Sequence, residues 1–189
     1  WATAAAPKPV AGTELSAQPG LFSADEPDDG SRLLAENLPL LSGKIGDWGA
    51  GWGYLSAAVL RQAGPFEQLH LIEADRRALD LATASLAPLA SAQGTELHPH
   101  WLDARLPTGL RGLDAIVTNP PFHLGDRQVL SAGLAFVETA ARALRGAGRL
   151  YLVSLKSLPF AAALEQHFTR TRVRATNGRY NVYEADHPR

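Results

Sequence analysis

Residues 118–123 read Thr-Asn-Pro-Pro-Phe-His and combine a rigid turn with groups that could bind an amine. Two successive prolines fix two φ angles and remove two backbone donors, and the residue before them is restricted to extended conformations. The segment therefore offers mainly acceptors, namely the side-chain oxygen of Asn119 and nearby carbonyls such as that of Pro120. Such a loop suits an amino group, which carries N–H donors, and Phe122 offers a flat face on which a ring could stack.

A second motif combines regularly spaced glycines with an acid. Residues 46–53 read GDWGAGWG, so Asp47 precedes Gly49, Gly51 and Gly53. The glycines allow a tight turn and let a ligand approach the backbone. A dinucleotide-binding turn has the spacing G-x-G-x-x-G and holds a pyrophosphate, which a neighbouring carboxylate would repel. The D-x-G-x-G-x-G spacing therefore favours a cationic ligand.

Further acids follow the next two expected strands. Glu73 lies about 20 residues after the glycines, where an acid can accept hydrogen bonds from both hydroxyls of a ribose. Asp75 competes for that role, although it also suits the N-cap of the next helix. Asp103 follows the third expected strand.

Alternating elements must position these groups. We expect strands at residues 44–49, 68–74, 95–102, 113–119 and 149–155, and two more flanking Asn177-Gly178. We expect helices at residues 31–38, with Ser31 as N-cap, and at 54–64, 75–94, 129–148 and 158–168. This alternation predicts an α/β fold, a doubly wound seven-stranded Rossmann-like sheet that is mostly parallel. The Asn-Gly hairpin is too short for a parallel crossover, so the last strand must be antiparallel.

The composition indicates one domain with an N-terminal arm. The chain has 189 residues, no cysteine and no methionine, and it begins with tryptophan. We interpret it as part of a longer protein, with residues 1–30 as linker or arm and 31–189 as a catalytic domain. The absence of cysteine excludes disulfides and fits a reducing compartment. No apolar stretch reaches ~20 residues and the histidines lack H-x-x-x-H spacing, so we expect a cytoplasmic protein without a membrane span or a metal.

The formal net charge of −1 is unevenly distributed, because residues 140–189 carry +6. Arg170, Arg172 and Arg174 alternate along one expected strand and should share a face, with Val173 directed to the core. This face should meet solvent or a polyanion such as RNA. The alternative is that the arginines only protect an exposed sheet edge.

The NPPF sequence matches the [DNS]-P-P-[aromatic] signature of class I S-adenosylmethionine-dependent methyltransferases that modify nitrogen on planar groups. Its form NPPFH resembles that of the bacterial ribosomal RNA guanine-N2 methyltransferases of the RsmC/RlmG type. Residues 19–34, PGLFSADEPDDGSRLL, and residues 177–185, NGRYNVYEA, resemble two other segments of that family. The resemblance covers residues 19–185.

The resemblance implies the class I methyltransferase fold, S-adenosylmethionine as cofactor and S-adenosylhomocysteine as product. It implies methyl transfer to the exocyclic N2 amine of a guanine in ribosomal RNA, small-subunit RNA being favoured. The partner is then ribosomal RNA or a ribosomal subunit, and the full-length protein would carry an N-terminal non-catalytic domain.

The resemblance also assigns roles to residues. It places Asp47, Gly49 and Gly51 around the methionine part of the cofactor, Glu73 on the ribose and Asp103 near the adenine. It places Asn119, Pro120 and Phe122 at the target base, with Asn119 also beside the cofactor. Trp48 replaces a small residue of the family and could change the width of the pocket, and Glu73 replaces an aspartate.

Other interpretations stay open at this point. An enzyme of the same fold could methylate adenine or a protein glutamine, and a non-catalytic module could bind the cofactor or RNA. A nicotinamide-dependent dehydrogenase is disfavoured by the glycine spacing and by NPPF. His123 could act as a base or could shape the loop through hydrogen bonds.

Overall fold

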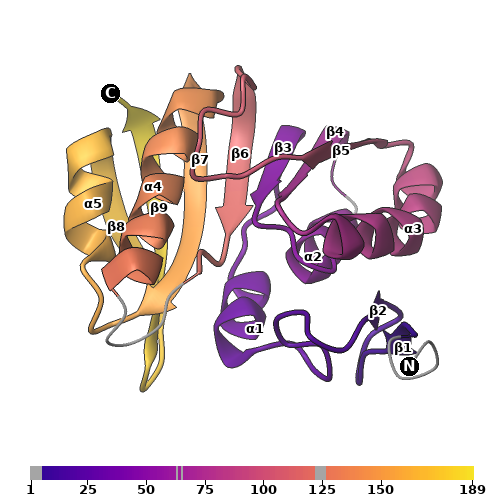
Figure 1. The fold of residues 1–189 in the computed structure, drawn as a ribbon. Coiled ribbons are helices and arrows are strands. Elements are labelled where there is room, and N and C mark those ends of the chain that lie inside the picture. Colours follow the sequence, from indigo (N-terminus) through magenta and orange to yellow (C-terminus); the bar gives the residue numbers. More distant parts are fainter. Residues whose placement is uncertain (1–5, 63, 65, 122–126) are drawn as a thin grey trace.

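The computed structural model describes residues 6–62, 64, 66–121 and 127–189, which form one large sheet with helices on both faces (Figure 1). The strands of this sheet are β3 (Gly43–Trp48), β4 (Phe66–Glu73), β5 (Glu96–Trp101), β6 (Leu113–Thr118), β7 (Leu144–Leu155), β8 (Phe168–Thr176) and β9 (Tyr180–Pro188). The helices are α1 (Asp29–Glu36), α2 (Tyr54–Leu60), α3 (Arg76–Gln93), α4 (Arg127–Ala143) and α5 (Phe160–His167). No helix in these described ranges is long and apolar enough to cross a membrane.

The sheet has seven strands in the order β5-β4-β3-β6-β7-β9-β8. The strands from β5 to β7 pair in parallel, whereas β9 is antiparallel to both β7 and β8. The mostly parallel, doubly wound sheet with an antiparallel last strand is therefore confirmed. The chain leaves β3 toward β4 on one side and later returns to β6 on the other, so β3 marks the switch point of the topology.

The hairpin between β8 and β9 fixes the direction of the last strand. The Oδ1 atom of Asn177 accepts hydrogen bonds from the backbone N–H groups of Arg179 and Tyr180 at 2.9 and 2.8 Å. This side-chain turn brings Thr176 into register with Asn181. The turn makes β8 and β9 antiparallel neighbours, and β9 lies between β7 and β8 in the sheet.

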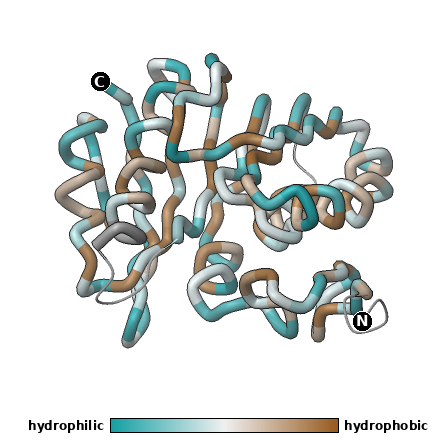
Figure 2. Tube along the Cα trace, viewed as in Figure 1, coloured by the Kyte–Doolittle hydropathy of each residue, from teal (hydrophilic) through white to brown (hydrophobic). Residues whose placement is uncertain are grey.

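Each face of the sheet has its own apolar core, because successive strand residues point to opposite faces. Val117 and Val153 join the cluster under α1, α2 and α3, whereas Ile116 and Leu152 join the cluster under α4 and α5. Hydrophobic residues accordingly recur along the central strands (Figure 2). The central strands are thus buried on both faces, as parallel strands require.

The boundary between α4 and β7 differs most from that expected from the sequence. Strand β7 begins at Leu144, not at residue 149, and α4 ends at Ala143. The reason is that Leu144 already pairs with Leu113 of β6, and the two glycines at 146 and 148 do not favour a longer helix.

The expectation that Ser31 caps the first helix is wrong. Helix α1 begins at Asp29, and its N-cap is Asp28. The Asp28 side chain accepts hydrogen bonds from the backbone N–H groups of Gly30 and Ser31 at 3.0 and 3.2 Å. Ser31 lies inside the helix, which leaves its hydroxyl available for another contact.

Part of the N-terminal segment packs against the domain. Strands β1 (Lys8–Pro9) and β2 (Ser16–Ala17) pair with each other, and Val10 and Leu15 are buried in the core cluster of α1 to α3. The segment before α1 therefore contributes to the same core. The division at residue 30 between an arm and a catalytic domain stays a prediction.

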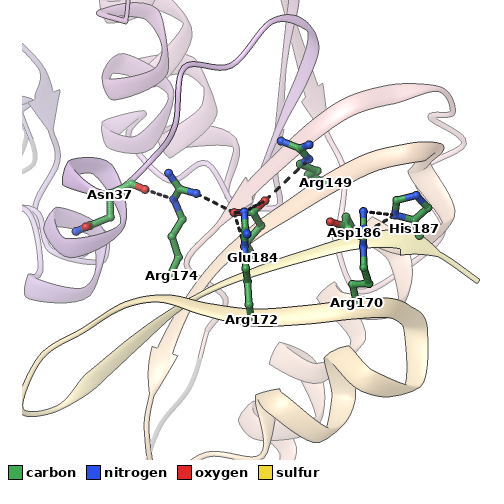
Figure 3. Close-up of polar contacts among 8 residues, drawn as sticks. All are labelled: Asn37, Arg149, Arg170, Arg172, Arg174, Glu184, Asp186 and His187. Atoms are coloured by element: carbon green, nitrogen blue, oxygen red, sulfur yellow. Dashed lines mark hydrogen bonds and ion pairs between the residues drawn. The ribbon is translucent and has the colours of Figure 1, made fainter.

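Three arginines of β8 share one face, as expected, and meet two acids of β9 (Figure 3). Arg170 pairs with Asp186 at 2.7 Å, and Arg172 and Arg174 pair with Glu184 at 2.9 and 2.8 Å. Arg149 of β7 lies 3.9 Å from the same Glu184 carboxylate, which is 2% exposed. We call Arg149, Arg170, Arg172 and Arg174 the arginine surface.

Val173, which was expected to face the core, is 51% exposed. Strand β8 lies at the edge of the sheet, and its pairing with β9 shifts register between Val173 and Ala175. Alternation along an edge strand therefore separates two faces without burying either of them.

Candidate active site

A cleft opens at the carboxyl ends of β3, β4 and β6. It consists of two adjoining cavities that share Phe22, Gly49, Gly51, Glu73 and Asn119 in their walls. One cavity extends toward α1 and the segment before it, and the other extends toward Asp103 and Pro120. The cleft thus lies at the switch point of the sheet, where open α/β sheets bind their ligands.

The glycine turn between β3 and α2 forms one wall of the cleft. The N–H groups of Gly49 and Ala50 donate to the carbonyl of Ile72 at 2.9 and 3.0 Å, which ties the turn to β4. Gly51 has a φ of +54°, and a Cβ built on it would meet no protein atom within 4 Å. At Gly49 a Cβ would lie 3.0 Å from the ring of Phe136. The Cα of Gly51 therefore faces open space, where a ligand can approach the backbone.

Glu73 connects this turn to the next helix. One carboxylate oxygen accepts the N–H of Gly51 and the other accepts the N–H of Asp75, both at 2.8 Å. Asp75 caps α3, as expected, by accepting the N–H of Arg77 at 2.9 Å. A carboxylate oxygen has more than one acceptor site. Glu73 can therefore still bind hydroxyl groups, and its assignment to a ribose stays a prediction.

Asp47 lies beneath the glycine turn and is fully buried. Its Oδ2 atom accepts a hydrogen bond from Ser56 Oγ of α2 at 2.7 Å, whereas Oδ1 has no hydrogen-bond partner within the described part of the chain. Burial raises the pKa of this carboxyl to about 7. The side chain does not line either cavity, so a contact with the methionine part of a cofactor stays a prediction.

Asp103 lines the second cavity together with Ala104 and Phe136. Its carboxylate forms an ion pair with Arg105 at 2.6 Å. Hydrogen bonding to the Arg105 guanidinium holds the pKa of Asp103 below its ordinary value. Asp103 therefore stays an ionised acceptor at neutral pH, and its contact with an adenine is still a prediction.

Asn119 directly follows β6 and lines both cavities. The preceding Thr118 hydroxyl donates to the carbonyl of Trp48 at 2.7 Å, which fixes the end of β6 against β3. The amide Nδ2 of Asn119 donates to both carboxylate oxygens of Asp28 at 3.1 Å and to Ser31 Oγ at 2.8 Å. The structure thus brings α1 against the end of β6.

Pro120 lines the second cavity beside Asn119. Phe122 and His123 lie outside the described residues, so the stacking role of Phe122 stays a prediction. The Pro-Pro loop also packs closely on α4, because a Cβ on Gly133 would lie 2.6 Å from the carbonyl oxygen of Pro121. A glycine at this helix position lets the loop approach the helix backbone.

Several residues of the cleft were missed by the sequence reasoning. They are Phe22, Asp28, Ser31, Arg105 and Phe136. The suggestion that Trp48 sets the width of the cleft is wrong. Trp48 is fully buried on the α4 face, where its indole N–H donates to Thr139 Oγ1 at 3.2 Å.

His98 and His100 on β5 form an H-x-H pair, a spacing that the expectation of no metal site overlooked. In the structure the ring of His70 stacks on both, and His70 Nδ1 lies 3.0 Å from His100 Nε2. Within the described ranges, no group of three or more His, Asp or Glu side chains is arranged to hold a metal ion.

Comparison with known proteins identifies the family. The family model for the methyltransferase small domain matches residues 12–184, and the chain belongs to this family. It is 36% identical over 173 residues to ribosomal RNA small subunit methyltransferase C of Hahella chejuensis, covering 91% of this chain and 49% of that protein. The protein of the same name from Shewanella pealeana is 34% identical over 164 residues, which cover 87% and 46% of the two chains. This chain therefore spans about half the length of the curated relatives it matches.

A solved structure shows the same fold. The 16S rRNA N2 methyltransferase RsmC of T. thermophilus, in complex with AdoMet and guanosine, superimposes with a TM-score of 0.73 at 30% identity. The match covers 95% of this chain and 49% of that chain. An O-methyltransferase of Thermotoga maritima shares the fold with a TM-score of 0.61 at 17% identity. The class I methyltransferase fold expected from the sequence is thereby confirmed.

The buried carboxyl of Asp47 should give the protein an unusual dependence of stability on pH. The folded state holds a proton at Asp47 up to about pH 7, whereas the unfolded chain releases it near pH 4. The folded state therefore loses stability relative to the unfolded state as the pH rises through this window. We expect the free energy of unfolding of the wild type to fall relative to that of Asp47→Asn between pH 4 and 7. Denaturant unfolding at several pH values measures this difference in the free energy of unfolding. A difference that does not change with pH would contradict the raised pKa of Asp47.

Proposed function

We propose that this chain transfers a methyl group from S-adenosylmethionine to the exocyclic N2 amine of a guanine in ribosomal RNA, with small-subunit RNA as the favoured substrate. The observation that carries the proposal is Asn119, an amide at the end of β6 that lines the cleft beside the glycine turn. The names of the matched relatives support the same reaction. The proposed partner is thus ribosomal RNA or a ribosomal subunit, and the proposed location is the cytoplasm, where that substrate occurs.

The residues of the cleft fit S-adenosylmethionine. The described walls contain the acids Asp28, Glu73, Asp75 and Asp103, against the single base Arg105. An acidic cleft suits a ligand that carries a sulfonium and an ammonium group, and it disfavours a pyrophosphate. Gly51 leaves open space beside the backbone, and Asp47 holds an unpartnered oxygen beneath the turn.

Three acidic positions and one amide would hold this cofactor. The glycine turn with Asp47 would lie at the methionine end, Glu73 at the ribose and Asp103 at the adenine. When bound, S-adenosylmethionine supplies an electrophilic methyl group on a positively charged sulfur. Asn119, which lines both cavities, lies where the amine and the cofactor would meet.

The chain's own contribution to the chemistry is acceptance of N–H groups and positioning. An exocyclic purine amine is a weak nucleophile because its lone pair is delocalised into the ring. The Asn119 side-chain oxygen and the Pro120 carbonyl would accept its N–H donors, favour a pyramidal nitrogen and stabilise the positive charge that develops there. No strong base is needed, because the methylated nitrogen is acidic and loses its proton to water or to these acceptors. Alignment in the cleft supplies the rest of the rate enhancement.

A methyl-transfer assay tests the proposal directly. The chain is incubated with tritiated-methyl S-adenosylmethionine and with undermodified small- or large-subunit RNA, and the product nucleosides are separated. We expect label in N2-methylguanosine from small-subunit RNA. Label in N6-methyladenosine would contradict guanine as the target base. Cofactor binding without transfer to any RNA would indicate a non-catalytic module.

Gly51→Ala should lower the affinity for S-adenosylmethionine and leave the protein folded. The new methyl group projects into the cleft, where it competes with the ligand for space. Gly94→Ala is the matched control, because Gly94 also has a positive φ, +66°, with no atom within 4 Å of a built Cβ, and it lies at the end of α3. Both variants should lose about 1 kcal/mol of stability.

Calorimetry separates the two glycine variants. We expect the affinity for S-adenosylmethionine to fall at least about tenfold in Gly51→Ala and to stay unchanged in Gly94→Ala. Equal affinity in both folded variants would show that the glycine turn does not contact the cofactor.

The arginine surface should contribute to RNA binding. Arg170 and Arg172 are 66% and 67% exposed although each is paired with an acid of β9, so their remaining N–H groups can reach phosphates. We expect Arg170→Gln with Arg172→Gln to flatten the log–log dependence of RNA affinity on salt by roughly 0.7–0.9 per lost contact. Arg142→Gln on α4 removes an ion-paired arginine that is 54% exposed and should have no effect. An unchanged slope in the double variant would show that these arginines serve only the sheet edge.

A further inference from the structure

The orientation of the Asn119 amide is fixed by α1. Its Nδ2 atom donates to Asp28 Oδ1 and Oδ2 at 3.1 Å and to Ser31 Oγ at 2.8 Å. A carboxylate has no hydrogen to donate, so the amide group facing Asp28 must be the NH2 and not the oxygen. These partners lie 91 and 88 residues earlier in the sequence, which makes the contact purely tertiary.

The partner carboxylate is itself held in place. Asp28 Oδ1 also accepts the backbone N–H groups of Gly30 and Ser31 at the start of α1, where the helix dipole favours a negative charge. A Cβ on Gly30 would lie 3.0 Å from Asp28 Oδ1 and 3.2 Å from the ring of Tyr180. The glycine of the Asp-Asp-Gly-Ser segment therefore leaves room for the carboxylate in the position that Asn119 uses.

We propose that Asp28 and Ser31 are positioning residues that hold the Asn119 amide with its oxygen toward the cleft, so that the site accepts N–H donors. This inference rests on the proposed function, since it concerns how the same cleft receives an amine. An asparagine amide has similar shape in its two orientations, and only its hydrogen-bond partners select one of them. A flipped amide would present NH2 to an incoming amine, donor against donor, and the cleft would lose its acceptor.

Asp28→Asn is the most informative variant. Asparagine is as good an N-cap as aspartate, so α1 should be preserved. Because the capping oxygen stays with the N–H groups of Gly30 and Ser31, the new NH2 takes the place of Oδ2 and faces the NH2 of Asn119, so one acceptor of the Asn119 amide becomes a donor. Ser31→Ala removes only the hydroxyl contact, and Asp29→Asn is the control that removes a charge from the same helix turn.

Turnover and cofactor affinity separate positioning from binding. In single-turnover methyl transfer at saturating S-adenosylmethionine, we expect Asp28→Asn to lose about 10²-fold, the scale of one lost preorganised group. Ser31→Ala should lose less, and Asp29→Asn should match the wild type. The affinity for S-adenosylmethionine should change much less than the rate in Asp28→Asn, because Glu73, Asp75 and Asp103 still make the cleft acidic, and it should match the wild type in Asp29→Asn. A loss of affinity in Asp28→Asn with an unchanged rate at saturation would make Asp28 a cofactor ligand and overturn the proposal.

A reciprocal exchange gives a result that a merely structural role cannot produce. In the double variant Asp28→Asn with Asn119→Asp, the new amide at position 28 donates to the new carboxylate at position 119, which again offers an acceptor to the cleft. We expect the double variant to recover at least about tenfold of the rate that Asp28→Asn loses, an amount within the usual range of coupling between contacting residues. A double variant whose loss of rate equals the combined losses of Asp28→Asn and Asn119→Asp would contradict the proposal.

Nuclear magnetic resonance of the side-chain NH2 groups tests the orientation without any reaction. The Asn119 NH2 protons should exchange slowly in the wild type and faster in Asp28→Asn, and the Asp29→Asn spectrum should match the wild type. If the wild type methylates no RNA, the proposed function fails while this measurement still decides the orientation. Unchanged Asn119 signals in Asp28→Asn would overturn the positioning role even if methyl transfer is observed.

Discussion

The carboxylate of Glu73 joins three parts of the cleft, since it lies at the end of β4 and accepts N–H groups from the glycine turn and from the start of α3. Together with the bonds from Gly49 and Ala50 to Ile72, it holds the turn in a conformation with positive φ angles. The glycine turn then fixes the opening beside Gly51 and the first residues of α2. Because β3 is the switch point of the sheet, whatever holds its end also sets the distance to the end of β6, where Asn119 lies.

Charge is divided between two regions of the molecule. The cleft is lined by carboxylates, and the buried Asp47 lies beneath its glycine turn. The arginine surface lies on β7 and β8, away from the glycine turn, with its guanidinium groups ordered by Glu184 and Asp186 (Figure 3). This separation suits a protein that binds a cationic small molecule in its cleft and a polyanion on its outer surface.

The features that local patterns control were predictable from the sequence. The Asn177-Gly178 turn specifies the antiparallel last strand, and Asp75 could be recognised as a helix cap because capping depends on neighbouring residues. Contacts between distant segments leave no such signal. Asp28 and Asn119 meet only because α1 packs beside the end of β6, so the sequence pointed to Ser31 as the cap and missed Asp28 altogether. Val173 followed the alternation rule but lies on an edge strand, where alternation no longer implies burial.

The proposed chemistry requires that the acidic, glycine-edged cleft binds S-adenosylmethionine and not a dinucleotide. Isothermal titration calorimetry of the chain with S-adenosylmethionine and, separately, with NAD⁺ distinguishes the two ligands. We expect saturable binding of S-adenosylmethionine at one site per chain and no measurable heat of binding for NAD⁺, whose pyrophosphate would meet the carboxylates of the cleft. Saturable binding of NAD⁺ without binding of S-adenosylmethionine would contradict this expectation.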